Sequence, residues 1–376
     1  MENQPPRTLI EHFSSITDPR IDRTKRHKLI DILTIAICAT ICGAETWEEL
    51  EIFGQAKQDW FKSFLQLPNG IPSHDTFRRV IARIDPEQFR QCFLQWVRSS
   101  YELTQGQVVA LDGKLSRGSV DRRTGKSAIN MVSAWASQNR LVLGQVKVDE
   151  KSNEITAIPE LLEMLEIAGC IVTIDAIGCQ KEIATKIVEK GADYLLAVKA
   201  NQGNLYEDLA DYFQWAVEDK FKQTTFTMHQ TTDGDHGRIE VRRCYASNDI
   251  EWLRNKEDWT GIGSIVMVER ERTPDGEETS CERGYYISSM RGDAKALSEA
   301  VRGHWSIENS LHWVLDVGFR EDASRIRKGH GPENMATLRH IALNLLKQDK
   351  SIKVGTRSKR LKAGWDEGYL LRVLSG

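Results

Sequence analysis

Three carboxylates in this sequence occupy positions from which side chains commonly do chemistry. Asp112 closes the apolar run VVALD and Asp175 closes the run IVTID, so each follows a pattern typical of a buried β-strand. Glu308 lies in a helical pattern between His304 and His312, each four residues away, and the three would share one helix face. Carboxylates and imidazoles in such positions indicate metal-ion or proton chemistry.

Each of these residues also has an ordinary structural interpretation. An aspartate at the end of a strand commonly begins a turn, and a polar stripe on an amphipathic helix is commonly solvated. Two such aspartates in one sheet favour the functional interpretation, because neighbouring strands would bring like charges together. A cation between them would then keep both ionised. Ends of strands are also where α/β folds place ligand-binding groups.

An all-oxygen site predicts Mg²⁺ or Mn²⁺ as its ion. Asp112 and Asp175, completed by Glu308, would bind two ions about 3.5 to 4 Å apart, the arrangement used in phosphodiester cleavage. One ion activates the attacking water or hydroxyl, and the other stabilises the leaving oxygen. The competing hypothesis is zinc bound by His304, Glu308 and His312, but the HExxH pairing of zinc proteases is absent from the sequence.

The elements that would position these residues follow from hydrophobic periodicity. A helical pattern covers residues 29–100 with a break at PNGIPS, after which Ser73 is a candidate helix cap. Alternating patterns then predict three strands at 107–112, 130–137 and 141–148. The later elements expected are a helix at 154–168, a strand at 170–175, a helix at 180–190 and a strand at 193–199. This order predicts an α/β fold with a mixed sheet flanked by helices.

The chain divides into five parts on these patterns. Charged, strand-like pieces such as GRIEVRRCYA indicate a β-rich insertion before the Glu308 segment. The last 52 residues contain 12 Lys and Arg against four Asp and Glu, which indicates a basic end. The predicted parts are an N-terminal helical, DNA-binding domain at 1–104, a first part of the catalytic core at 105–203, the insertion at 204–283, a second part of the core at 284–350 and a basic C-terminal tail at 351–376.

Composition is that of an ordinary intracellular protein. The formal net charge is -3, and a hydrophobic fraction of 40% can fill a core. The longest apolar run, residues 32–43, is too short to span a bilayer, and no signal pattern opens the chain. The seven cysteines are scattered, without a CxxC pair or a zinc-finger cluster. We therefore expect a cytoplasmic location and no membrane partner.

Several cations and amides are candidates for contacts with DNA phosphates. They are Arg78 and Arg79 in the N-terminal helical region, Lys114 and Arg117 after Asp112, Lys199, Asn201 and Gln202 near the end of the strand at 193–199, Arg325, Arg327 and Lys328 in the basic end, and the cations of residues 347–362. A short helix, a turn and a second helix around Arg78 would suit a groove-reading unit. A plain helical bundle and solvated loops explain the same residues equally well.

Four motifs carry a resemblance to a known family. VALDGK around Asp112, TIDAIGCQ around Asp175, DYLLAVKANQ after it and HWSIENSLHWVLDVGFRED around Glu308 resemble the H-repeat-associated transposases of bacterial Rhs elements. These are similar to the wider class of insertion-sequence transposases, which carry an Asp-Asp-Glu triad on a ribonuclease-H-like core. The resemblance covers nearly the whole chain, including the helical front segment and the β-rich insertion before the Glu.

The resemblance implies cutting at terminal inverted repeats and joining of the freed 3′ hydroxyl to target DNA. It assigns Asp112, Asp175 and Glu308 as ligands of two Mg²⁺ or Mn²⁺ ions. The implied partner is double-stranded DNA, bound at both the element ends and the target by a homo-oligomer in a synaptic complex. The implied location is the bacterial cytoplasm, in association with the nucleoid.

One departure from the wider class concerns the residues around the Glu. That class has a Tyr seven residues before, an Arg four before and a Lys seven after, whereas this chain has Val301, His304 and Leu315. The DNA-contacting roles of the Arg and the Lys therefore do not carry over, although His304 can contact a phosphate. The pattern does not predict whether a hairpin intermediate forms at the cut end.

Two alternatives to a transposase remain open on the sequence. A ribonuclease-H-like nuclease that acts on branched or damaged DNA would need the triad but no paired end sequences. A DNA-binding protein without chemistry, derived from a mobile element, would need neither. The intact triad argues against the second of these alternatives.

Overall fold

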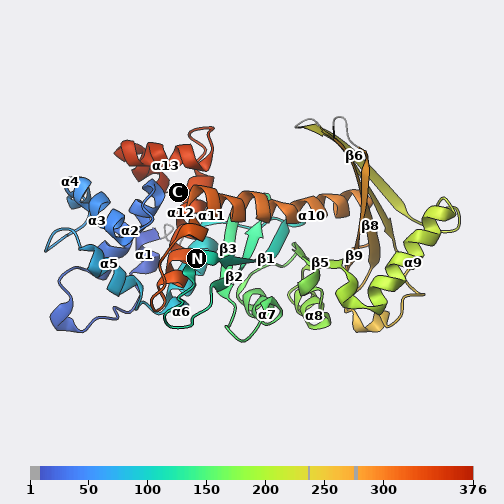
Figure 1. The fold of residues 1–376 in the computed structure, drawn as a ribbon, viewed down its shortest axis with the longest axis horizontal. Helices are drawn as coiled ribbons and strands as arrows, with labels where there is room; N and C mark the ends of the chain where they lie inside the picture. The colour runs from blue at the N-terminus through green and yellow to red at the C-terminus, as the bar shows by residue number, and fades with distance from the viewer. Residues whose placement is uncertain (1–8, 236–237, 275–277, 376) are drawn as a thin grey trace, which may run out of the picture.

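A mixed β-sheet forms the centre of the molecule, with helices on both faces and a group of helices at one end (Figure 1). The computed structural model describes residues 9–235, 238–274 and 278–375. The first eight residues of the predicted N-terminal domain therefore lie outside the described residues.

The core of this sheet consists of five strands in the order β3-β2-β1-β4-β5. They are β1 (Val108–Ser116), β2 (Ile129–Ala136), β3 (Leu141–Lys147), β4 (Ile171–Ile174) and β5 (Asp193–Val198). β1, β4 and β5 are parallel, whereas β2 is antiparallel to both of its neighbours. Their β-branched and apolar residues suit a pleated sheet buried on both faces. The order and directions are those of a ribonuclease-H-like core, so the predicted α/β fold is confirmed.

Helices cover the two faces of the core sheet. α7 (Glu154–Met164) and α8 (Lys181–Glu189) lie on one face, and α10 (Ala294–Ile307), α11 (Trp313–Gly318) and α12 (Gly331–Gln348) lie on the other (Figure 1). Successive side chains of a strand point to opposite faces, and β3 shows the consequence. A Cβ on Gly144 would meet Leu161 of α7, whereas Gln145 donates a hydrogen bond to Thr337 of α12.

The predicted insertion extends the core sheet instead of forming a separate subdomain. Its strands are β6 (Thr227–Asp235), β7 (Arg238–Ser247), β8 (Ser264–Pro274) and β9 (Ser280–Ser288). β9 pairs with β5 from Leu195 opposite Ser288 to Val198 opposite Tyr285, which makes one sheet of nine strands. The boundary predicted after residue 283 thus falls inside β9. The insertion also begins with a helix that the sequence patterns did not predict, α9 (Asn204–Glu218).

The N-terminal region is helical, as predicted. Its helices are α1 (Leu9–Phe13), α2 (Leu29–Cys42), α3 (Trp47–Ala56), α4 (Gln58–Lys62), α5 (His74–Ile81) and α6 (Pro86–Ser100). α2 is apolar around most of its circumference and is buried at the centre of the group. Thr46 caps α3 in a reciprocal bond pattern with Glu49. Ser73 occupies the N-cap position of α5, as predicted, but its side chain makes no cap hydrogen bond.

The end of the chain is folded, which corrects the prediction of a basic tail. Residues 356–375 form α13 (Thr356–Trp365) and α14 (Glu367–Ser375). Arg360 is buried and donates hydrogen bonds to the backbone oxygens of Thr40 in α2 and Gly318 in α11, while its guanidinium lies over the Phe319 ring. Lys359 is also buried and donates to the backbone oxygen of Leu346. These two cations are therefore not free to bind phosphates.

Across the residues that the structure describes, no single helix is both long and apolar enough to span a bilayer. α2 and α3 meet the length and composition criteria only as a pair bent by 96°. Both contribute side chains to the protein core.

Candidate active site

The first two carboxylates of the predicted triad lie side by side at the end of β4. The parallel pairing of β1 and β4 ends with Leu111 opposite Ile174, and Asp112 and Asp175 are the next residues on the two strands. Asp175 then accepts a hydrogen bond from the backbone of Ile177, which starts a 3₁₀ turn. The prediction that Asp112 also ends its strand was wrong, because β1 continues to Ser116 against β2 alone.

Glu308 lies at a break in the helix that crosses the sheet. α10 ends at Ile307, a π turn covers Glu308–His312, and α11 follows (Figure 1). The sequence predicted one regular helix with a four-residue repeat. A π turn adds a residue to the helical turn, and such turns occur frequently at functional sites because they redirect side chains.

The three carboxylates line one cavity of about 150 Å³ between the sheet and α10. Lys199 and His304, two of the candidates for phosphate contacts, line the same cavity. The further lining residues are Thr173, Ile174, Ala176, Leu195, Ala197, Tyr286, Val301 and Trp305. Strand pairing and one crossing helix thus bring together groups that are distant in the sequence.

The surroundings of Asp112 disfavour the ionised form of its carboxyl group. Burial is the main cause that raises the pKa of Asp112 to about 7, and the charge of Asp175 adds to it. Glu154 and Glu308 contribute in the same direction, whereas a hydrogen bond from the backbone of Gly113 opposes them. A bound cation would reverse this effect, because it favours the ionised carboxylate.

The donor atoms of the triad fit a hard divalent cation. Asp112, Asp175 and Glu308 offer only oxygen, which suits Mg²⁺ or Mn²⁺. Their ligand atoms do not form a group of three within 4.8 Å of one another.

The zinc hypothesis was wrong. His304, Glu308 and His312 do not bring three ligand atoms within 4.8 Å of one another. Nδ1 of His304 lies 3.1 Å from the hydroxyl of Thr173 on β4, and Nδ1 of His312 lies 3.5 Å from Asp112. Burial lowers the pKa of His304, and burial together with Lys114 lowers the pKa of His312 to about 4. Both rings are therefore neutral at neutral pH, and the contact of His312 with Asp112 is not an ion pair.

Lys114 is a structural residue rather than part of an exposed loop. It lies within β1, and its ammonium is 2.7 Å from Asp316, 3.4 Å from Glu321 and 3.5 Å from Asp322. Glu321 in turn pairs with the buried Arg339. The ammonium is thus already neutralised by three carboxylates, and this corrects the expectation that it is free for DNA.

The amides predicted after β5 support the turn that follows Asp175. Asn201 donates a hydrogen bond to the backbone oxygen of Ala176 at 2.9 Å, and Gln202 donates to that of Cys179 at 2.5 Å. These bonds hold the turn in place beside the cavity. Lys199, in contrast, lines the cavity itself.

A second groove contains most of the other predicted DNA contacts. Arg78, Arg117, Arg325, Arg327 and Lys328 all line it, although they come from three distant parts of the sequence. Arg79 is exposed on α5 but does not line this groove.

Glu154 is a fourth acidic residue near the site that sequence reasoning missed. A Cβ added to Gly113 would lie 1.9 Å from a carboxylate oxygen of Glu154, at the start of α7. Gly113 points to the face of the sheet opposite Asp112, because successive strand residues alternate. Glu154 therefore influences Asp112 through the electrostatic field and not as a fellow ligand. The glycine after Asp112 in the VALDGK motif was the available signal.

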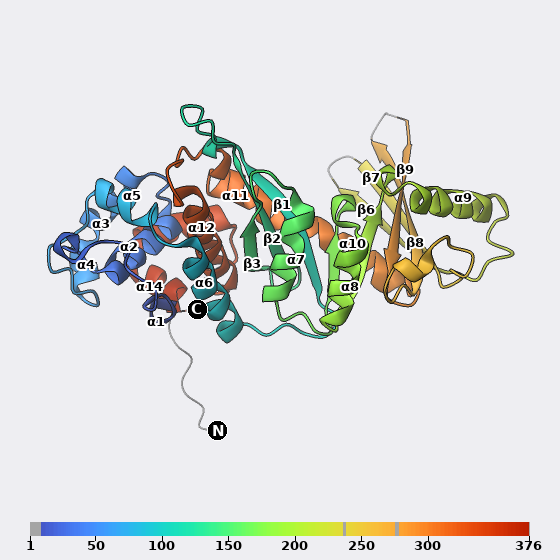
Figure 2. The same cartoon turned by 90° about the horizontal axis from the view of Figure 1, so that it is seen from below.

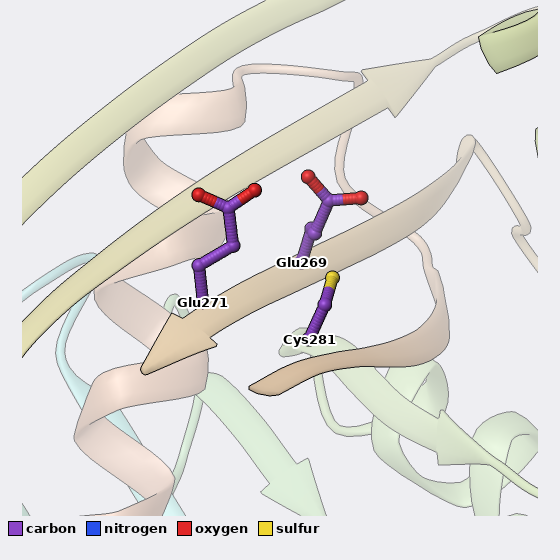
Figure 3. Close-up of side chains that lie close together, drawn as sticks. All are labelled: Glu269, Glu271 and Cys281. Carbon is purple, nitrogen blue, oxygen red and sulfur yellow. The ribbon is translucent and has the colours of Figure 1, made fainter. Parts of the chain in front are cut away.

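One cluster in the described residues does bring three ligand atoms within 4.8 Å of one another, and it lies outside this cavity, in the β-rich insertion. Figure 3 shows Glu269, Glu271 and Cys281 on β8 and β9. Arg243 already pairs with Glu269 at 3.2 Å and with Glu271 at 2.8 Å, and Arg283 pairs with Glu269 at 3.1 Å. These arginines compensate the negative charge without an ion.

Comparison with protein families decides what kind of protein this is. A model described as the transposase DDE domain matches residues 103–345, and a model described as DDE_Tnp_1-associated matches residues 10–97. The chain belongs to the DDE-domain transposases. It is therefore a DNA transposase of an insertion element, and the alternatives left open by the sequence are not favoured.

Its relatives match over nearly their full length. Putative transposase YncI of Escherichia coli O157:H7 is 44% identical over 371 residues, which cover 98% of this chain and 94% of the relative. The H repeat-associated putative transposase YhhI of Escherichia coli strain K12 is 43% identical over 378 residues and 98% of each chain. A solved piggyBac transposase synaptic complex with hairpin DNA aligns with 98% of this chain and 79% of that chain, at 13% identity and a TM-score of 0.45.

Proposed function

We propose that this DDE-domain transposase cleaves DNA at the terminal inverted repeats of its element and joins the freed 3′ end to target DNA. Asp112, Asp175 and Glu308 would hold two Mg²⁺ or Mn²⁺ ions. The observation that carries the proposal is that these three carboxylates line one cavity, in which burial and neighbouring charges disfavour the ionised form of Asp112. Divalent ions supply the positive charge that activates an attacking oxygen and stabilises the leaving one.

Different residues of the chain would position the metal ions and the reacting phosphate. Asp112 and Asp175 are fixed by strand pairing, whereas Glu308 is exposed on its π turn. The ammonium of Lys199 would hold a phosphate oxygen in the cavity. The neutral rings of His304 and His312 would orient neighbouring groups without adding charge.

We further propose that the protein acts as a homo-oligomer that pairs two element ends, in the cytoplasm of a bacterial cell where the nucleoid lies. The DDE-domain family supports DNA as the partner. Pairing of ends follows from the proposed reaction, since both ends of an element must be cut before the element is inserted elsewhere.

The test uses near-isosteric variants on DNA that carries the sequence flanking the gene. Asp112→Asn, Asp175→Asn and Glu308→Gln should each reduce Mg²⁺-dependent cleavage by roughly a hundredfold or more, because each removes an anionic ligand. Glu269→Gln, in the cluster of Figure 3, is the matched control and should cleave at the parental rate.

A second readout does not depend on activity. Mn²⁺ binding, measured by calorimetry, should be lost in the three triad variants and retained in Glu269→Gln. If any triad variant binds Mn²⁺ and cleaves like the parental protein, that residue is not a ligand. Full cleavage in the presence of a chelator would refute the metal mechanism as a whole.

A further inference from the structure

A basic groove outside the triad cavity has the chemistry of a phosphate-binding surface. Its volume is about 930 Å³, and its lining includes seven arginines and lysines but only two aspartates, Asp121 and Asp322. The seven cations are Arg78, Arg117, Arg122, Arg123, Arg325, Arg327 and Lys328. We refer to it as the arginine groove. Such a concentration of one sign of charge creates a strong local field in a chain whose net charge is only -3.

Three parts of the chain supply the cations of the arginine groove. Arg78 comes from α5, a second group from the connection between β1 and β2, and a third from the segment between α11 and α12. In Figure 2 the β1–β2 connection and α11 lie together near α5. The groove therefore joins the N-terminal helices to the core that carries the triad.

Backbone contacts fix these three parts against one another. Arg327 donates a hydrogen bond to the backbone oxygen of Gly118, and a Cβ on Gly118 would lie 2.3 Å from the backbone oxygen of Ser324. His330 donates its backbone N–H to Ala82 at the end of α5. A groove that is already assembled loses little entropy when a ligand binds.

Most cations of the arginine groove have no acidic partner. Arg78 pairs with Asp75 at 2.6 Å, and Arg117 lies 3.6 Å from Asp322. Within the described part of the chain, the other five have no carboxylate at salt-bridge distance. Arg122, Arg123, Arg325 and Lys328 are exposed. Cations that are held together without counter-charges are suited to a polyanion.

The arginine groove is connected to the triad by a single strand. β1 carries Asp112 and ends at Ser116, immediately before Arg117. Five residues of extended chain cover about 16 Å. At 3.4 Å per base pair, this distance corresponds to about five base pairs of duplex.

We propose that the arginine groove binds the phosphate backbone of the same DNA duplex that the triad cleaves, about five base pairs from the reacting phosphate. This inference rests on the proposed function and assigns it a DNA-binding surface. Phosphate contacts fix the register and orientation of a duplex without reading its sequence. The arginine groove would therefore set which phosphate reaches the triad, while base recognition takes place elsewhere.

The test changes two walls of the arginine groove separately in the full chain. Arg122→Ala/Arg123→Ala alters the β1–β2 connection, and Arg325→Ala/Lys328→Ala alters the segment after α11. Lys151→Ala/Arg372→Ala removes the same charge from exposed positions outside the arginine groove and is the matched control. Circular dichroism checks that all three variants are folded.

Fluorescence anisotropy in the presence of a chelator measures binding to a duplex of roughly 20 base pairs, or two helical turns, without cleavage. Each groove variant should flatten the slope of log affinity against log salt by about 2, because each phosphate contact contributes about 0.9. The loss should be equal for the element end and an unrelated duplex. A hydroxyl-radical footprint should lose protection about five base pairs from the cleavage position.

The outcomes separate this inference from the proposed function. The arginine groove is not the binding surface if the groove variants keep the parental slope of log affinity against log salt. The same holds if the slope of the control flattens as much as theirs. Either result would stand even where the triad variants abolish cleavage. The inference would also be overturned if the groove variants lost affinity for an RNA duplex of equal length but not for the DNA duplex. A parental protein that binds no DNA duplex would overturn both proposals.

Discussion

Lys114 on β1 forms a 2.7 Å ion pair with Asp316 on α11. Lys114 lies two residues after Asp112 on the same strand. The strand that carries one carboxylate of the triad is thereby fastened to the helical segment that carries Glu308. Glu321 and Asp322 complete the cluster around the same ammonium. The geometry of the cavity therefore depends on a buried charge that takes no part in the proposed chemistry.

Removal of this buried cation should be costly. Lys114→Met should lower the free energy of unfolding by about 3 kcal/mol, because it removes the buried cation that Asp316, Glu321 and Asp322 share and leaves Glu321 with Arg339 alone. Urea denaturation measures the change. Asp316→Asn in the same background should cost much less than it does alone, since its partner is already absent. Additive losses in the double variant would contradict the coupling.

Asp112 should make the metal-free protein less stable as the pH rises. Its raised pKa, about 7, means that the folded state retains a proton that the unfolded state has released. The stability from this proton is present below about pH 4 and lost as the pH rises through 7. Asp112→Asn should therefore melt at least roughly 2 °C above the parental protein at pH 8 in a chelator.

Addition of Mg²⁺ should reverse the order of the melting temperatures, so that the parental protein melts above Asp112→Asn. The ion should raise the melting temperature of the parental protein but not that of Asp112→Asn, because binding to the folded state alone stabilises it. The prediction is wrong if the difference in melting temperature between the two proteins does not change with pH, or if Mg²⁺ stabilises both equally. Asp112 would then not be repelled by neighbouring negative charges.

The Glu154 carboxylate occupies the space that a side chain at position 113 would need. Gly113→Ala should lower the free energy of unfolding by about 1 kcal/mol, because the new methyl displaces the Glu154 carboxylate from its 3.0 Å hydrogen bond with Asn130. In a Glu154→Ala background the same substitution should cost nearly nothing. An equal cost in both backgrounds, measured by chemical denaturation, would locate the strain elsewhere.

Acid should destabilise the protein through a buried histidine in α12. Burial and the nearby cations Arg339 and Lys114 lower the pKa of His340 to about 3, whereas an unfolded histidine titrates near 6.5. Stability from the neutral ring is present above pH 6.5 and is lost as the pH falls towards 3. Between pH 6.5 and 5 this loss is about 2 kcal/mol.

The glutamine variant isolates this contribution. His340→Gln should show a correspondingly smaller decrease in stability between these two pH values, because its amide does not titrate. The comparison uses the pH dependence and not the absolute stability, so a variant that is less stable overall still gives an answer. A decrease as large as that of the parental protein would exclude His340 as the source.

Two of the parallel strands in the core sheet were predictable because their signal is local. β4 and β5 are short apolar runs, and the structure places them within a residue or two of the predicted bounds. The continuation of β1 beyond Asp112 was not predictable, since Gly113 and Lys114 look like a turn in isolation. Their extended backbone is held by β2, and the charge of Lys114 is balanced by residues about 200 positions away.

Arg360 shows the same limit at the end of the chain. A run of cations predicts a solvated tail, because isolated buried charge is expensive. Backbone oxygens of Thr40 and Gly318 satisfy this guanidinium, and no local pattern reveals partners so distant in the sequence. The pairing of β9 with β5 was hidden for a similar reason, since the backbone bonds that join two strand edges leave no mark on the side-chain pattern of either strand.

The contact between Arg360 and Thr40 also bears on the order in which the molecule folds during synthesis. α2 is made early, whereas α12 and α13, which pack against it, are synthesised only after the whole core sheet. The N-terminal helices therefore cannot complete their packing until α13 has left the ribosome. A copy of the gene that stops early would yield a chain in which both ends are incompletely folded, and proteases would remove it. Decay of the element by premature stop codons should thus leave little protein behind to compete for its DNA ends.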